Sequence, residues 1–188
     1  LLSAEAFLTH CICGGGVMEE KITALLATLK ALGVQRAALI DTAQISFDES
    51  FRRQCEQNVC GHFNKNWMCP PAVGSFAELK ARALKYKKGL VFQTVHQLED
   101  SFDFEGMMEG TEKHTQISRQ VIQYIRDKDL FADFLPLNVG PCTYCETCSY
   151  TDGQECRVPE EAIASVESYG IDVTALVRSC GIPYNNGP

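Results

Sequence analysis

Apolar residues recur at helical spacing near the start of the chain and then give way to a short continuous run. The positions i, i+3, i+4 and i+7 are occupied by Ile22, Leu25, Leu26 and Leu29. This stripe is typical of an amphipathic helix, and Gly33 is expected to end it. The run from Arg36 to Ile40 then predicts a buried strand. The stretch therefore predicts one helix followed by one strand.

A second helix–strand unit and a third helix follow along the chain. Ser75 and Glu78 have the spacing of a capping box, which predicts a helix beginning at this serine. The apolar, β-branched run 90–95 predicts the next strand. Ile117, Val121 and Ile125 mark a further helix within roughly 111–128. Helix and strand signals thus alternate through the middle of the protein.

The last third of the chain predicts shorter elements. Residues 134–139 predict a short strand, and Pro136 places it at the edge of the sheet because proline cannot donate to a ladder. Pro159 suits the first position of a short helix that would end near Gly170. Asp172 suits the N-cap of a second short helix. Cys180 would then lie on the apolar face of that helix, as a buried thiol or as a metal ligand.

These elements predict an α/β (α+β) fold, with a small mixed β-sheet flanked by helices and two cysteine-rich metal-binding loops. The chain of 188 residues suits a single domain. Residues 1–17 precede Met18 and are expected to be an N-terminal extension, and residues 18–188 to form a single α/β metal-binding domain. Cys11 and Cys13 lie in this extension and are weaker ligand candidates for that reason.

The densest chemical signal is a run of three cysteines at three-residue steps. Cys142, Cys145 and Cys148 are followed eight residues later by Cys156. A Cys-x2-Cys-x2-Cys run with a more distant fourth cysteine is the ligand spacing of four-iron clusters. Zinc sites more often use two separate Cys-x2-Cys pairs. The run therefore predicts an iron–sulfur cluster.

An earlier group of three cysteines predicts a second metal-binding loop. Cys55, Cys60 and Cys69 precede two prolines, which stop any regular element there. Because this group has only three thiols, its fourth ligand must come from elsewhere or stay open. His62, Cys180 and a cysteine of the later run are the candidates, and the sequence does not choose between them.

Charge and hydropathy exclude several classes of partner. The formal net charge of −7 and the lack of a basic stripe argue against nucleic acid. No apolar run reaches the roughly 18 residues that a membrane-spanning helix needs. Residues 1–17 lack the basic start of a secretory signal, so a cytoplasmic protein is expected. The acidic stretch 99–105 could dock a basic redox partner, although such stretches are more often solvated loops.

Five segments in order resemble the prokaryotic "predicted metal-binding protein" family, a domain of unknown function found in anaerobic bacteria and archaea. The segments are 51–55, 60–71, 140–148, 156–159 and 164–173, of which the last ends in Gly-Ile-Asp-Val. The resemblance runs from about Met18 to the end of the chain and implies no established reaction. It implies metal ligands at Cys55, Cys60, Cys69, Cys142, Cys145, Cys148 and Cys156.

The cysteine pattern supports one main function and two alternatives. One or two 4Fe-4S clusters would make the protein an electron carrier in anaerobic metabolism, with a redox partner protein. The first alternative is a structural zinc protein that acts as an interaction module. The second is an enzyme whose three-cysteine cluster keeps an open iron as a Lewis acid.

Overall fold

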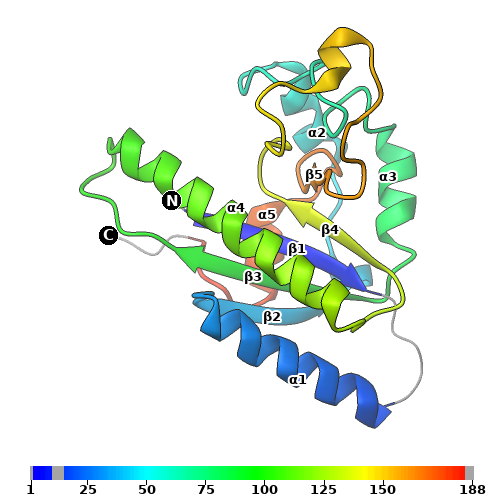
Figure 1. The fold of residues 1–188 in the computed structure, drawn as a ribbon, viewed down its shortest axis with the longest axis vertical. Helices are drawn as coiled ribbons and strands as arrows, with labels where there is room; N and C mark the ends of the chain where they lie inside the picture. The colour runs from blue at the N-terminus through cyan, green and yellow to red at the C-terminus, as the bar shows by residue number, and fades with distance from the viewer. Residues whose placement is uncertain (1, 10–14, 185–188) are drawn as a thin grey trace.

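A five-stranded mixed sheet forms the centre of the protein (Figure 1). A computed structural model describes residues 2–9 and 15–184. The strand order is β2-β3-β1-β4-β5. β1 is antiparallel to β3 and β4, β2 is antiparallel to β3, and β5 is parallel to β4. The bounds are β1 (Leu2–Thr9), β2 (Arg36–Asp41), β3 (Lys88–Val95), β4 (Phe134–Asn138) and β5 (Ala164–Ser165).

Helices cover both faces of this sheet, which confirms the predicted mixed α+β fold. Figure 1 shows α4 crossing one face of the sheet, with α1 alongside β2. Two 3₁₀ turns, η1 (Thr42–Gln44) and η2 (Ser149–Asp152), lie between the larger elements. The helices are α1 (Gly15–Ala31), α2 (Glu49–Glu56), α3 (Phe76–Ala83), α4 (Phe104–Asp127) and α5 (Val173–Ser179).

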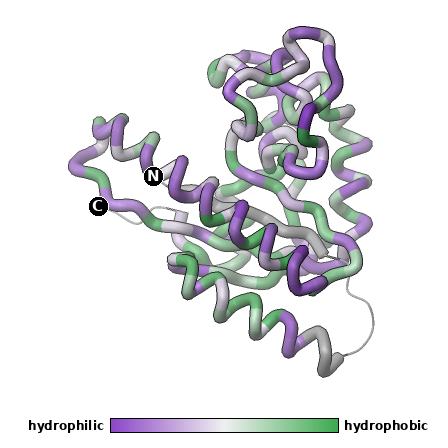
Figure 2. Tube along the Cα trace, in the orientation of Figure 1, coloured by the Kyte–Doolittle hydropathy of each residue, from purple (hydrophilic) through white to green (hydrophobic). Residues whose placement is uncertain are grey.

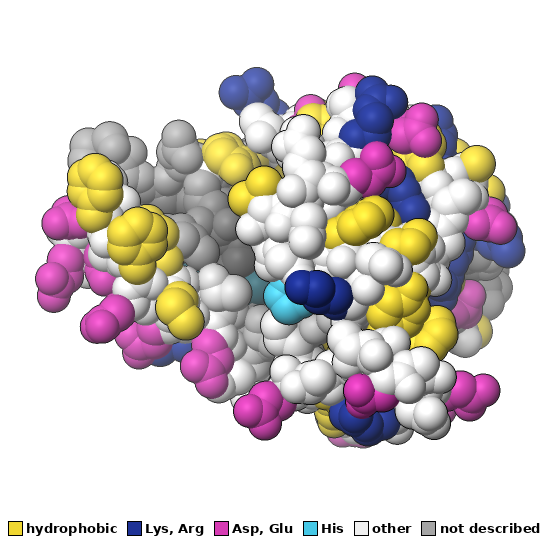
Figure 3. Space-filling model, turned by 90° about the horizontal axis from the view of Figure 1, so that it is seen from above, with side chains coloured by type: hydrophobic (Ala, Val, Ile, Leu, Met, Phe, Trp, Pro, Cys, Tyr) yellow, Lys and Arg dark blue, Asp and Glu magenta, His cyan; other side chains and the backbone are white. Residues whose placement is uncertain are grey.

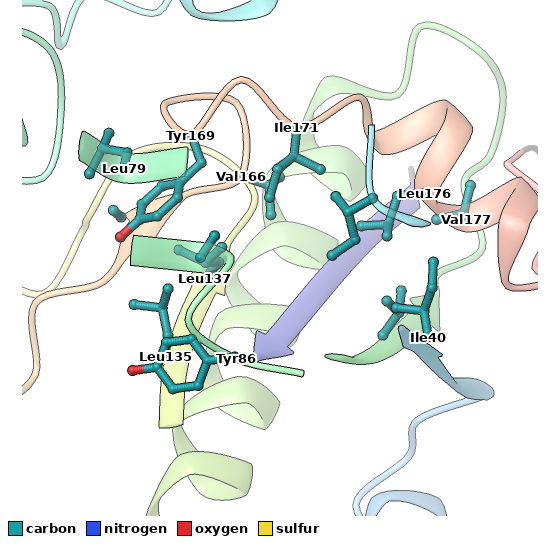
Figure 4. Packing of buried hydrophobic residues seen from close by; sticks show 14 of the residues in the cluster. Ile40, Leu79, Tyr86, Leu135, Leu137, Val166, Tyr169, Ile171, Leu176 and Val177 are labelled. Carbon is teal, nitrogen blue, oxygen red and sulfur yellow. The ribbon is translucent and has the colours of Figure 1, made fainter. Parts of the chain in front are cut away.

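Alternation along β3 divides the core into two layers. Leu90 and Phe92 face the layer under α1 and α4, whereas Val91 faces the other layer. Successive side chains of a strand point to opposite faces, so one strand serves both cores. The second layer lies under α3, α5 and the loop after β5, and Figure 4 shows its packing. Its members include Ile40, Leu79, Leu135, Leu137, Val166, Tyr169, Ile171, Leu176 and Val177.

The helix and strand signals of the first two thirds of the chain are confirmed, but the predicted burial of the strand at 36–40 is wrong. β2 lies at the edge of the sheet, where Arg36 and Leu39 are exposed and only Ile40 is buried. Both hydrogen bonds of the capping box are present: Glu78 N–H donates to Ser75 Oγ at 3.3 Å, and Ser75 N–H donates to Glu78 Oε2 at 2.8 Å. α4 begins earlier than expected, because Asp103 caps it by accepting from the Gly106 N–H. Figure 2 shows hydrophobic and hydrophilic turns alternating along this helix.

Two expectations for the last third of the chain are wrong. β4 is not an edge strand, since β5 pairs beside it; β5 reaches only Leu137 and Asn138, so Pro136 lies beyond that pairing. Residues 159–170 do not form a helix but turns and the two residues of β5. The reason is burial: Ile163 packs into one core layer and Val166 into the other, which an extended backbone allows and a helical stripe does not.

The N-terminal segment supplies a strand to the sheet. β1 pairs along its whole length with β3, from Leu2 opposite Val95 to Thr9 opposite Lys88. α1 begins at Gly15, before Met18. The sheet therefore includes residues from both sides of the predicted boundary at residue 17, and the domain division stays a prediction. Cys11 and Cys13 lie outside the described residues. None of the described helices has the length and apolar character needed to cross a membrane.

Gly170 lies at a close contact between the Phe76 ring and the Asp48 backbone, where a larger side chain would clash. Its φ is +69°, and a Cβ there would lie 2.5 Å from the Phe76 ring and 2.9 Å from the Asp48 carbonyl oxygen. Gly153 has a φ of +66°, but a Cβ there meets no described atom within 4 Å. Both alanine variants incur the same backbone strain, and only Gly170→Ala adds a clash. We expect Gly170→Ala to lose about 2 kcal/mol more unfolding free energy than Gly153→Ala, measured in urea. Equal losses would contradict this packing.

Candidate metal centre

The two cysteine groups lie in loops that pack side by side above the sheet. Figure 1 places the loop after α2 next to the long loop that follows β4. Cys55 lies near the end of α2, and Cys60 and Cys69 lie in the loop after it. Cys142, Cys145 and Cys148 follow β4, and Cys156 comes after η2. Segments about eighty residues apart in sequence thus form one region.

The first loop is closed by its own backbone and by asparagine side chains. Asn64 N–H donates to the Pro70 carbonyl at 2.8 Å, and Cys69 N–H donates to the Asn66 carbonyl at 3.0 Å. Asn58 Oδ1 accepts from Phe63 N–H at 3.0 Å. Asn58 and Asn64 both have a φ of 54°, a conformation that asparagine tolerates better than most residues. These contacts hold Cys60 and Cys69 in one ordered loop.

Polar bonds from this loop fasten it to the second loop. The buried Asn66 donates through Nδ2 to the Cys142 carbonyl at 2.8 Å. Trp67 Nε1 donates to the Gln154 carbonyl at 3.0 Å, and the Tyr150 hydroxyl donates to Asn64 Oδ1 at 2.8 Å. The rings of Trp67 and Tyr150 meet edge to face, with centroids 4.9 Å apart. These aromatic residues therefore join the two loops.

The second group surrounds a hollow. Cys142, Cys145, Cys148 and Cys156 all line the same small cavity. Trp67 and Met68 of the first loop line it as well, so both loops contribute to its wall. The four cysteines of this group supply soft donors of the kind that zinc and iron–sulfur clusters use.

Cys69 links the two groups electrostatically. Its side chain is buried, and this burial, together with the neighbouring thiols, raises its pKa to about 12. The contributing thiols belong to both groups: Cys60, Cys55, Cys142 and Cys148. Burial also raises the pKa of Cys55, with further contributions from Cys60 and from Glu167. A positive metal centre would reverse this balance by favouring the thiolates.

The structure leaves the fourth ligand of the first group open. Among the residues that the structure describes, no group of three or more His, Cys, Asp or Glu is placed to share a single metal ion. The cysteines in this part of the chain are free thiols. Cys180 is the C-cap of α5 and is half-buried, packed against the core. Ligation by the seven candidate cysteines therefore stays a prediction, as does any role of His62 or Cys180.

Glu167 is a charged residue of this region that the sequence analysis missed. Its Oε2 atom is shielded from solvent and has no hydrogen-bond partner among the described residues. Burial raises the pKa of its carboxyl, opposed by hydrogen bonds from backbone N–H groups and the Ser165 side chain. The sequence signal was a single acidic residue within the otherwise uncharged segment 162–171.

The raised pKa of Cys69 predicts slow alkylation. Only the thiolate reacts, so a pKa of about 12 cuts the reactive fraction at pH 8. The higher intrinsic nucleophilicity of such a thiolate offsets part of this loss. We expect iodoacetamide to modify Cys69 on the order of a hundredfold more slowly than an ordinary exposed thiol in reduced, metal-free protein.

Cys60, which is exposed, is the internal reference for this measurement. Mass spectrometry of the peptides would give both rates in one sample, and unfolding in urea should remove the difference. Equal rates in the folded protein would contradict the burial of Cys69.

Comparison with known proteins identifies the family of this chain. A family model described as "Predicted metal-binding protein (DUF2284)" matches residues 38–188, which include both cysteine groups. No curated protein and no solved structure matches the chain.

Proposed function

Because the chain belongs to this predicted metal-binding protein family, we propose that it is an iron–sulfur protein that carries electrons. Cys142, Cys145, Cys148 and Cys156 would hold a 4Fe-4S cluster. Such a cluster accepts and donates one electron at a time at a potential that its surroundings set. The residues around it would supply burial and N–H groups directed at its sulfurs.

The hollow lined by the four cysteines of the second group is the observation that supports this proposal most directly. A zinc ion draws its four sulfurs to one point, at about 2.3 Å each. In a four-iron cluster each thiolate binds a different iron, so the ligands surround a volume. The spacing of the run suits the cluster, and all four cysteines border the same small cavity.

The first group would hold a second cluster. Cys55, Cys60 and Cys69 provide three thiols, and Cys69 lies within electrostatic reach of Cys142 and Cys148. Two clusters this close would exchange electrons readily, which suits a carrier. A three-thiol cluster with an open iron would instead support catalysis at that iron.

Metal and sulfide content of anaerobically purified protein tests the proposal. About eight irons with matching acid-labile sulfide would indicate two clusters, and about four would indicate one, as the cysteine count allows. An electron paramagnetic resonance signal that appears when dithionite reduces the protein would support electron transfer. Stoichiometric zinc without a chromophore would overturn the proposal in favour of a structural zinc module.

A further inference from the structure

The first half of α4 and the loop before it expose large apolar side chains. Phe102, Phe104 and Met108 are 78 %, 69 % and 75 % exposed. Figure 3 shows hydrophobic side chains gathered at one end of the molecule with acidic side chains around them. Apolar patches rimmed by polar groups commonly mark interaction sites. We call residues 99–116 the α4 surface.

The charge of this surface is strongly negative, although Lys113 lies within it. Residues 99–112 contain six carboxylates and neither Lys nor Arg, a net charge of −6. Asp103 is used locally as the N-cap of α4, and Glu109 pairs with Lys113 at 2.7 Å. The other carboxylates are Glu99, Asp100, Glu105 and Glu112. They surround the exposed apolar residues with negative potential.

A groove leads from this surface to the candidate metal centre. It is lined by Phe104, Met108 and Glu112 at one end and by Arg119 and Thr143 at the other, and it encloses about 1430 Å³ with its open mouth included. Thr143 directly follows Cys142 in the chain.

Two smaller hollows continue the groove towards the thiols. The first shares Arg119 and Thr143 with the groove and is also lined by Cys142 and Tyr144. The four-cysteine hollow in turn shares Cys142 and Tyr144 with it. The Arg119 guanidinium lies 4.8 Å from the centre of the Tyr144 ring, which joins α4 to the cysteine loop. A partner seated in the groove would lie against the wall of the proposed cluster site.

We propose that the α4 surface docks a basic electron-transfer protein, an inference that rests on the proposed function. Phenylalanine and methionine suit the centre of such an interface, and the acidic rim would steer a positively charged partner. A second copy of this chain suits the surface poorly, because it brings the same net charge of −7. The groove would set the partner beside Cys142, where electron transfer needs it.

Cytochrome c, a small basic haem protein, is a suitable probe. Cluster-loaded protein, reduced with dithionite and freed of excess reductant, is mixed with oxidised cytochrome c at low ionic strength in a stopped-flow instrument. The test variant is Glu109→Gln with Glu112→Gln, both exposed and both lining the groove. We expect its second-order rate constant to fall about tenfold and to depend less on salt than the wild-type rate constant.

The matched control is Glu19→Gln with Glu20→Gln, which makes the same charge change on α1. These exposed residues lie near the opposite end of α4, since the adjacent Lys21 donates to the Leu130 carbonyl at 2.9 Å. The control should keep the wild-type rate. The docking surface would be overturned if the test variant kept the wild-type rate, or if the control variant fell as much as the test variant.

Calorimetric titration with oxidised cytochrome c separates the docking surface from the function. Weaker binding by the Glu109/Glu112 variant alone, in protein that fails to reduce cytochrome c, would reject electron transfer and keep the surface. If the wild type and both double variants bind cytochrome c equally and reduce it at the same rate, the proposed electron transfer stands and the proposed docking surface is rejected.

Discussion

We expect replacement of Cys145 by serine to remove the visible absorption and the iron of the cluster proposed at the second cysteine group. A serine hydroxyl keeps its proton at neutral pH and is a much poorer ligand for cluster iron than a thiolate. Cys145 is only half-buried and lines the hollow, so the change removes a proposed ligand with little effect on the core. Iron analysis and the absorption spectrum of anaerobically purified variant measure the outcome. An unchanged spectrum and iron count would take Cys145 out of the ligand set.

Cys180→Ala is the control for this experiment. It also removes a thiol, but from the C-cap of α5, where the side chain packs against the core. The variant should retain all its metal and lose about 1 kcal/mol of unfolding free energy to the small cavity. Loss of about half the iron would instead identify Cys180 as the missing fourth ligand of the first group.

Arg52→Ala will destabilise the protein by about 3 kcal/mol. Arg52 is 8 % exposed although it carries a charge. Its guanidinium donates to the Ser168 carbonyl at 2.9 Å and to the Gly74 carbonyl, so one side chain joins α2 to two other segments. Alanine would leave both carbonyls without this donor in a largely buried region, and hydrogen bonds to charged groups are among the strongest.

The neighbouring Arg53 provides the matched control. It is exposed, and Arg53→Ala should change the free energy of unfolding by less than about 0.5 kcal/mol. Urea denaturation of reduced, metal-free protein measures both variants without a contribution from metal binding. A loss below about 1 kcal/mol for Arg52→Ala would mean that its two bonds are replaceable, against the role inferred for it.

Local signals in the sequence predicted the elements that local chemistry decides. The capping box at Ser75 and the cap at Asp172 both formed, because a cap needs only neighbouring backbone groups. The segment 159–170 was wrongly predicted as a helix for the opposite reason. Its backbone follows its burial between two core layers and its pairing with β4, and both depend on residues far away in sequence.

The residues of the candidate site also divide into those that a local sequence pattern predicted and those that depend on distant contacts. The cysteine spacing alone predicted that Cys142, Cys145, Cys148 and Cys156 belong together, and they line one hollow. Trp67 joins the two loops through contacts that the sequence does not reveal. Its hydrogen bond to the Gln154 carbonyl joins residues that are 87 positions apart, and no local pattern in the sequence indicates such a contact. Glu167 was missed because a buried carboxylate looks like any surface glutamate until the fold encloses it.

The joining of the two loops has a consequence for how the protein matures on the ribosome. Cys55 and Cys142 are 142 − 55 = 87 residues apart, and Asn66 bonds the backbone of the latter. At the usual speed of translation, the thiols of the first group begin to emerge, with Cys55, roughly 4–17 s before Cys142 and the loop that completes their surroundings. During that interval they are open to oxidation and to any soft metal in the cell. Delivery of the proposed cluster would therefore belong after synthesis, once Asn66 and Trp67 have fastened the two loops together.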